Sequence, residues 1–151
     1  KPTRIYADVI GKLNRTFSVR GLCHVTGGGL YENLPRILPE GLGAKLELGG
    51  YRVPAVFTKL QEWGGVATEE MFHTFNMGIG MCIVVAAEDE EAVTACLAGA
   101  GEEPVRLGTI VSLQAEEEAA DSTEEAAAQI AEAAENLPER VELCGLNELQ
   151  S

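Results

Sequence analysis

The sequence predicts an α/β (α+β) domain in which helices pack on a layered, mixed β-sheet. Short runs rich in apolar and β-branched residues alternate with segments whose apolar residues recur every three or four positions. The chain has 17 glycines, and several of them form clusters that separate these segments where turns are expected. A length of 151 residues with 46% hydrophobic content suits one domain with a substantial core.

The first half of the chain is predicted to contain two helices and two strands. Residues 7–15 place apolar side chains on one helical face, and residues 19–26 (VRGLCHVT) form a β-rich run that stops at three glycines. Apolar residues then recur at helical spacing, and Pro35 interrupts or restarts that helix because proline fits only a first turn. Residues 39–43 (PEGLG) form a turn before a short strand over residues 44–48.

The second half is predicted to alternate three helices with three strands. Pro54 opens a helix that ends at Gly64 and Gly65, and Thr68 caps the next helix. The apolar residues of these two helices are Val56, Leu60 and Trp63 in a stripe, then Met71, Phe72 and Phe75 facing inward. The remaining elements are a strand over 79–87 (IGMCIVVAA) covered on both faces, a helix over 88–97 with Ala92, Val93, Cys96 and Leu97 on its buried side, and strands over 105–113 and 140–146.

The net charge of −13 is concentrated near the C-terminus. Residues 1–111 contain 13 acidic and 10 basic residues, whereas residues 112–151 contain 11 acidic residues and one basic residue. We therefore expect a main body over residues 1–113 and an acidic Ala/Glu-rich insertion over residues 114–138, either helical or disordered. Residues 139–151 would supply the final strand and a tail.

Composition excludes several classes of partner. The chain lacks the basic footprint needed for nucleic acid or an anionic membrane surface, and no apolar run approaches the roughly 18 residues of a membrane span. It begins at Lys1 without a basic-then-apolar leader, so we expect a piece of a longer cytoplasmic protein. The four cysteines match no zinc template and are interpreted as free thiols in a reducing cytosol, although a disulfide among them stays open.

The first candidate site is the sequence HVTGGG at residues 24–29. Glycines after a strand allow close approach to the backbone, and a helix N-terminus offers N–H groups to an anion such as phosphate. His24 and Thr26 leave the predicted strand on the same face and could converge on one ligand. A purely structural turn at Gly27, Gly28 and Gly29 and a hydrogen-bonded core histidine remain as alternatives.

A second candidate, TFNMGIGM, occupies residues 74–81. Asn76 carries an amide that can both donate and accept, and Gly78 and Gly80 permit tight backbone geometry. This pattern predicts a second phosphate-binding loop, with a plain helix end and turn as the alternative.

Polar residues outside these two segments have simpler interpretations. Glu32, Asn33 and Arg36 form either a solvated helix face or, through Arg36, an anion clamp. His73 is interpreted as an ordinary boundary histidine. No Walker loop, GxGxxG, GxSxG or HExxH pattern occurs, so P-loop, dinucleotide-binding, serine-hydrolase and zincin functions lack support.

Four segments, taken in order, resemble the C-terminal half of the phosphoribosylformylglycinamidine cyclo-ligase (aminoimidazole ribonucleotide synthetase) family. They are TRIY (3–6), HVTGGGLYENLPRILPEGLG (24–43), an aromatic–proline segment (51–54) and TFNMGIGM (74–81). The resemblance implies an enzyme that converts formylglycinamidine ribonucleotide and ATP, with Mg²⁺, to aminoimidazole ribonucleotide, ADP and phosphate. Two features depart from the family: Met77 stands where cysteine is more frequent, and the acidic segment is longer than expected.

The resemblance also implies that the active cleft lies between two halves of a homodimeric enzyme. The absent N-terminal half would carry most ligands of ATP and Mg²⁺, so this chain alone is expected to be inactive and to hold no tightly bound cofactor. Carried over to this sequence, His24 becomes the candidate catalytic residue, and no metal ligand is assigned. The candidate substrate- or phosphate-binding residues are Thr26, Gly27, Gly28, Gly29, Asn33, Asn76, Gly78 and Gly80.

Two other interpretations remain at this point. One is a related ATP-dependent synthetase, of the formylglycinamidine ribonucleotide synthetase or selenophosphate synthetase type. The other is a non-catalytic module that binds a phosphorylated ligand or a partner subunit.

Overall fold

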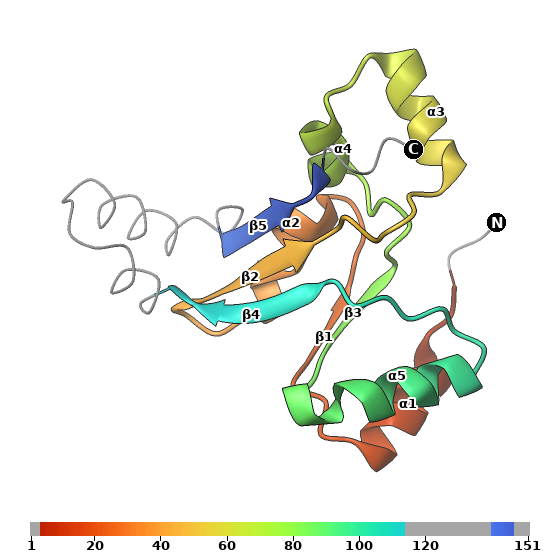
Figure 1. Ribbon diagram of the computed structural model, residues 1–151, viewed down its shortest axis with the longest axis vertical. Coiled ribbons are helices and arrows are strands. Elements are labelled where there is room, and N and C mark those ends of the chain that lie inside the picture. Colours follow the sequence, from red (N-terminus) through yellow and green to blue (C-terminus); the bar gives the residue numbers. More distant parts are fainter. Residues whose placement is uncertain (1–3, 114–139, 147–151) are drawn as a thin grey trace.

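The computed structural model describes residues 4–113 and 140–146 and has an α+β architecture with two sheets (Figure 1). Strands β1 (Gly21–His24) and β3 (Met81–Val84) form an antiparallel pair. The second sheet has the order β4 (Gly108–Ser112), β2 (Leu42–Glu47), β5 (Val141–Cys144), with β2 antiparallel to β4 and parallel to β5. The predicted fold class is confirmed, and the strands divide between two sheets. The predicted insertion over 114–138 lies outside the described residues.

Five helices flank these strands in the described part of the chain. They are α1 (Ala7–Thr16), α2 (Gly29–Asn33), α3 (Ala55–Gly64), α4 (Thr68–Thr74) and α5 (Glu90–Gly99), with 3₁₀ turns at Pro35–Ile37 and Ala87–Asp89. Pro35 begins its own turn directly after α2, as its missing N–H requires. No helix within residues 4–113 or 140–146 combines the length and the apolar character needed to cross a membrane.

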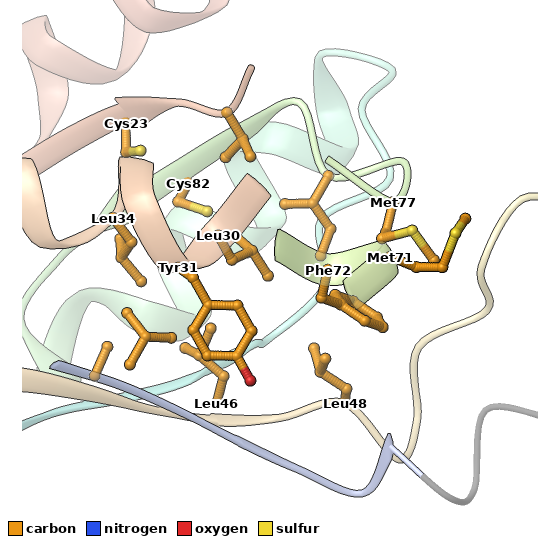
Figure 2. Close-up of a cluster of buried hydrophobic side chains, with 14 residues drawn as sticks. Cys23, Leu30, Tyr31, Leu34, Leu46, Leu48, Met71, Phe72, Met77 and Cys82 are labelled. Carbon is orange, nitrogen blue, oxygen red and sulfur yellow. The ribbon is translucent and has the colours of Figure 1, made fainter. Parts of the chain in front are cut away.

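The β1–β3 pair lies between two hydrophobic clusters, which confirms that the apolar strand is covered on both faces. On one side Cys82 joins the main cluster, which fills the space among the pair, α2, α4 and the three-stranded sheet (Figure 2). On the other side Ile83 packs against a smaller cluster built on Leu13 of α1 and Leu97 of α5. The two helices α1 and α5 lie side by side there (Figure 1). Each fully buried large side chain contributes about 1.5–3 kcal/mol of hydrophobic stabilisation.

Several predicted boundaries are wrong in informative ways. Both strands of the pair are four residues long. At one end of the pair the chain continues into the glycine loops, and at the other end the flanking residues Val19 and Val85 pack in the second cluster. Thr68 is not an N-cap: it is the first residue of α4, and its hydroxyl accepts a hydrogen bond from Gln61 Nε2 of α3 at 2.9 Å. Ala92, predicted on the buried side of α5, is exposed.

Helix α3 directs its predicted apolar stripe outward. Val56, Leu60 and Trp63 are 58%, 40% and 80% exposed, and no residue of α3 is fully buried. Phe57 instead attaches the helix to the main cluster, where its ring lies 6.0 Å from that of Phe75. The described part of the chain thus presents an apolar surface to solvent along one helix.

Arg140, just before β5, is a buried cation that the sequence pattern did not single out. It is 6% exposed, and its guanidinium donates hydrogen bonds to the carbonyl oxygens of Leu38, Pro39 and Leu42. These bonds join the C-terminal strand to the turn that enters β2. Because the guanidinium fork spreads its donors over three acceptors, a lysine cannot reproduce the arrangement.

We expect Arg140→Ala to lower the free energy of unfolding by about 2–4 kcal/mol, since it removes a buried side chain and leaves part-buried carbonyl groups without their donors. Arg140→Lys should recover only part of that loss. Urea denaturation followed by circular dichroism measures both. The matched control is Arg106→Ala, which removes an exposed ion pair with Glu90 (3.2 Å) and should cost no more than about 1 kcal/mol. Equal losses for Arg140→Ala and Arg106→Ala would contradict this role for Arg140.

Candidate functional site

The pairing of β1 with β3 brings the two glycine-rich segments to the same end of the strand pair. His24, the last residue of β1, lies opposite Met81, the first residue of β3. One position further on, the Val25 N–H donates a hydrogen bond to the Gly80 carbonyl oxygen at 3.0 Å. The loop that leaves β1 and the loop that enters β3 are therefore neighbours, although they are distant in the sequence.

The first loop, residues 26–29, requires glycine at two positions. Gly28 and Gly29 have φ values of +89° and +56°, in the left-handed region that other residues rarely adopt. A Cβ on Gly29 would also run into the carbonyl oxygen of Phe72 in α4, so this glycine permits close packing of α2 on α4. At Gly27 the neighbouring space is open, with no atom near the position of a Cβ.

The backbone of this loop offers hydrogen-bond donors to solvent. Among the described residues, no acceptor faces the N–H groups of Gly27 and Gly28. Helix α2 has only five residues, so these donors come from the loop conformation more than from a long helix dipole. The arrangement can bind an anion, which is the chemistry expected of this segment.

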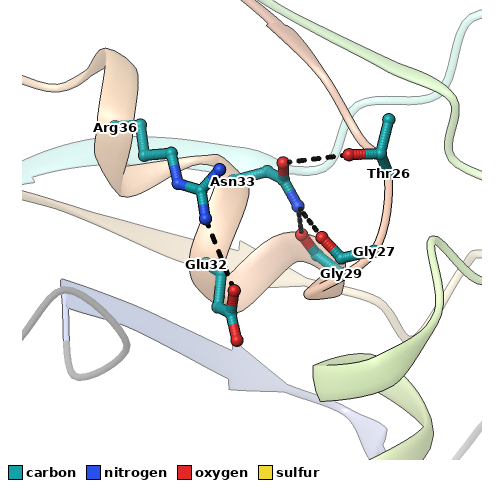
Figure 3. A network of polar contacts seen from close by, with 6 residues as sticks. All are labelled: Thr26, Gly27, Gly29, Glu32, Asn33 and Arg36. Carbon is teal, nitrogen blue, oxygen red and sulfur yellow. Dashed lines mark hydrogen bonds and ion pairs between the residues drawn. The ribbon is translucent and has the colours of Figure 1, made fainter.

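Asn33 holds the first loop in shape from inside (Figure 3). Its amide nitrogen donates hydrogen bonds to the carbonyl oxygens of Gly27 (3.0 Å) and Gly29 (2.8 Å), and its amide oxygen accepts one from the Thr26 hydroxyl (3.4 Å). Asn33 is 6% exposed. Its polar atoms are already occupied, so it positions the loop, and the Thr26 hydroxyl is engaged with it.

His24 lies on the exposed face of the strand, as does Thr26, while Cys23 and Val25 between and beside them are buried. This alternation confirms the predicted common face of the two polar residues. The interpretation of His24 as a hydrogen-bonded core histidine is not supported, because its side chain is exposed. Its ring meets the ring of Tyr6 edge-on, with centroids 5.9 Å apart and planes at 67°.

The second loop is held by its own side chains and by two tyrosines. Asn76 Oδ1 accepts a hydrogen bond from the Gly78 N–H at 3.0 Å, closing a tight turn. Met77 adopts φ +50° and buries its side chain in the main cluster, while its carbonyl oxygen accepts a hydrogen bond from the Tyr51 hydroxyl at 3.0 Å. A Cβ on Gly78 would lie 2.6 Å from that hydroxyl.

Tyr6 and Tyr51 are residues of this region to which the sequence assigned no role. The Tyr6 hydroxyl occupies the position that a Cβ on Gly80 would need, so a side chain at residue 80 would displace the phenol. Both tyrosines belong to segments that carry the family resemblance, and this membership is the sequence signal that could have identified them as site residues. Nothing in their local pattern indicates that they reach the glycine loops.

Other polar residues near the first motif match their simpler interpretations. Arg36 lies 3.4 Å from Glu32 in an exposed ion pair, as on a solvated helix face. His73 is half-buried and stacks on Tyr31, with ring centroids 3.9 Å apart and planes 4° from parallel. Burial, together with the nearby Glu69 carboxylate, raises the pKa of Tyr31.

The thiols are free in the described structure, and the two beneath the site are unsuited to nucleophilic chemistry. Cys23 and Cys82 face each other across the β1–β3 pair and are both buried. Burial, and to a smaller extent the adjacent Cys23, raise the pKa of Cys82 to about 12. Burial also raises the pKa of Cys23, against the opposing effect of Arg36. Both remain protonated at neutral pH, and the thiol is a poor nucleophile.

Two surface concavities of the described structure lie away from the glycine loops. A concavity of about 480 Å³ beside β5 and another of about 530 Å³ along α5 contain no residue of either loop. No group of three or more His, Cys, Asp or Glu side chains within residues 4–113 and 140–146 could hold a metal ion. The N–H groups of the first loop cannot coordinate Mg²⁺, and the Glu32 carboxylate beside Gly28 belongs to no cluster of ligands of the kind that this cation prefers.

Comparison with known proteins places this geometry in context. Residues 1–121 match the family model for AIR synthase related protein, C-terminal domain. A phosphoribosylformylglycinamidine cyclo-ligase of Trichlorobacter lovleyi is 47% identical over 112 residues, which cover 74% of this chain and 32% of the relative. The enzyme of the same name from Burkholderia vietnamiensis is 49% identical over 109 residues, which cover 72% of this chain and 31% of the relative. The one from Neisseria gonorrhoeae is 45% identical over 116 residues, which cover 77% of this chain and 34% of the relative. The chain spans about a third of the length of the curated relatives that it matches.

Asn33 of α2 and Asn76 of the second loop should differ in how much stability they lose on conversion to aspartate. Asn33→Asp replaces a donor to two carbonyl oxygens with a buried carboxylate, so we expect a loss of about 2–4 kcal/mol in the free energy of unfolding and altered amide resonances of Gly27–Gly29. Asn76→Asp keeps an acceptor for the Gly78 N–H, so its cost should stay below about 1 kcal/mol. Urea denaturation and amide NMR spectra measure both effects. A tolerated Asn33→Asp would show that Asn33 does not hold the loop.

Proposed function

The chain belongs to the AIR synthase related family, whose C-terminal domain it contains, and from this premise we propose that it is the C-terminal domain of a phosphoribosylformylglycinamidine cyclo-ligase. The whole enzyme would be a cytoplasmic ligase of purine biosynthesis. It would convert formylglycinamidine ribonucleotide and ATP to aminoimidazole ribonucleotide, ADP and phosphate.

The observation that carries the proposal for this part of the enzyme is the donor surface of the first glycine loop, which lies beside the second loop. The donors are the N–H groups of Gly27 and Gly28 and the exposed His24 ring. They lie at the end of the β1–β3 pair where the Val25 N–H donates to the Gly80 carbonyl oxygen. Every phosphorylated participant in the proposed reaction is an anion that such donors stabilise. We therefore assign this surface to the phosphorylated ribonucleotide.

The proposed chemistry has two steps. ATP transfers its terminal phosphoryl group to the formyl oxygen and leaves as ADP. An amidine nitrogen then attacks the former formyl carbon, the carbon–oxygen bond breaks, and phosphate departs while the nitrogen loses a proton. His24 is the group of this chain that we propose to move a proton or to polarise the substrate, because its exposed imidazole lies at the end of β1 from which the first loop leaves.

We propose that the rest of the enzyme completes the site. Mg²⁺ and most ATP ligands would come from the N-terminal half, because the groups around the two loops do not fit a metal ion. The exposed positions of Gly27 in the first loop and Gly78 in the second are consistent with a cleft closed by a second surface. The exposed stripe of α3 supports the same assembly, since the residue before the helix, Pro54, packs its ring against Gly78 of the second loop. The whole enzyme would be a homodimer.

Complementation tests the proposed function. We expect ATP-dependent formation of aminoimidazole ribonucleotide from formylglycinamidine ribonucleotide when this chain is mixed with a matching N-terminal half, and none from either half alone. In the mixture, His24→Ala should lower turnover by at least about 100-fold, as expected for loss of acid–base catalysis. His73→Gln, which changes the other histidine of the chain, is the matched control. A folded mixture without product would refute the cyclo-ligase function, and an active His24→Ala variant would refute only the role of His24.

Trp63 provides a direct test of the α3 surface, because it is the single tryptophan of the chain. Incorporated 5-fluorotryptophan should give one ¹⁹F resonance that shifts when the unlabelled N-terminal half is added. Leu60→Glu places a charge in the apolar stripe and should weaken assembly about tenfold or more, whereas Val105→Glu alters an exposed apolar residue outside α3 and should not. An unchanged resonance in an active mixture would exclude α3 from the interface.

A further inference from the structure

Tyr6 reaches the candidate site from a different part of the chain. It precedes α1, and its ring meets His24 edge-on at a centroid distance of 5.9 Å. Its hydroxyl lies over the Cα of Gly80, in the position that a side chain there would occupy. Tyr6 thus bridges the two motifs, with its ring beside the first and its hydroxyl beside the second.

Two attachments fix this position. The Tyr6 carbonyl oxygen accepts a hydrogen bond from the Ile10 N–H at 3.0 Å, which anchors the residue at the start of α1. Two residues earlier, Arg4 forms an ion pair with Glu102, just beyond α5, at 2.8 Å. Since α1 and α5 pack on the outer face of the β1–β3 pair through the Leu13 cluster, they hold Tyr6 against the end of that pair.

The hydroxyl of Tyr6 is available to a ligand. Among the described residues it has no hydrogen-bond partner, and it is not among their fully buried polar atoms, so solvent reaches it. Other donors lie at the same end of the strand pair: the exposed His24 ring, which contacts the Tyr6 ring, and the N–H groups of Gly27 and Gly28. The Glu32 carboxylate beside Gly28 is the acceptor of this region, and it lies in an ion pair with Arg36. A phenol can donate one hydrogen bond, and several donors that lie together can bind an anion.

We propose that Tyr6 is a further substrate-binding residue, whose hydroxyl donates a hydrogen bond to a phosphoryl oxygen of the bound ribonucleotide. This inference rests on the proposed function, because it uses the same donor surface and the same ligand. Gly80 is the complementary element: the absence of a side chain at this position leaves the phenol room to lie beside the loops.

The competing explanation is that Tyr6 only fills space beside Gly80. Tyr6→Phe separates the two, since it keeps the ring and its contact with His24 but removes the hydroxyl. Tyr31→Phe is the matched control: it makes the same chemical change at a tyrosine packed in the main cluster between α2 and the three-stranded sheet (Figure 2).

The experiment measures equilibrium binding to the assembled enzyme, this chain with its N-terminal half. The probes are formylglycinamidine ribonucleotide and the same nucleoside without its phosphate. We expect Tyr6→Phe to raise the Kd for the ribonucleotide about tenfold or more, with the Kd for the nucleoside and the thermal midpoint unchanged. Tyr31→Phe should leave both Kd values at those of the unsubstituted protein.

Each of the alternative outcomes contradicts one particular claim. If the unsubstituted enzyme binds the ribonucleotide and Tyr6→Phe binds it equally well, the hydroxyl has no part in recognition and only the inference fails. An equal loss for both probes would likewise overturn the contact with the phosphate. If the unsubstituted enzyme binds neither probe, the proposed function fails and the inference fails with it.

Discussion

The antiparallel pairing of β1 with β3 is the interaction on which the candidate site depends. Its register places His24 opposite Met81 and joins Val25 to Gly80, so both glycine loops begin at one end of the pair. A slip of one residue would turn His24 and Thr26 into the core and expose Cys23 and Val25. Hydrophobic clusters on both faces of the pair oppose such a slip, because each face has its own apolar side chains to bury. The packing of the core therefore also fixes the orientation of the polar surface.

The two loops are held by side chains whose polar atoms are already hydrogen-bonded to the loop backbone. Asn33 uses its amide to hold the carbonyl oxygens of the first loop, which leaves the N–H groups of Gly27 and Gly28 for an anion. Tyr51 holds the carbonyl oxygen of Met77 in the second loop. Such preorganisation lowers the cost of ordering the backbone when a ligand binds. The exposed apolar stripe of α3 is a separate feature, which the described residues of this chain do not cover.

Local sequence was a good guide where backbone geometry or periodicity decides the structure. Pro35 begins a new turn, Gly65 ends α3 in a left-handed conformation, and the apolar run at 79–87 contains a strand, β3, covered on both faces. The same reasoning misplaced strand ends, because these depend on where the partner strand stops. It also could not orient α3: an apolar stripe predicts a buried face only when the surface that covers it belongs to the same chain.

The sequence by itself determined the family, the fold class and the two glycine-rich segments, because these rest on residue identities and short-range spacing. Gly28, Gly29 and Gly78 adopt left-handed backbone conformations, which favour glycine in any tertiary context. A glycine in the sequence is therefore a local signal for such a turn. Only the tertiary structure decided which residues meet: Tyr6 at Gly80 and Arg140 at the turn before β2. Such contacts join residues far apart in the chain, and no spacing within one segment records them. The physical reason is that they depend on the packing of whole elements, whose relative positions are set by the shared core.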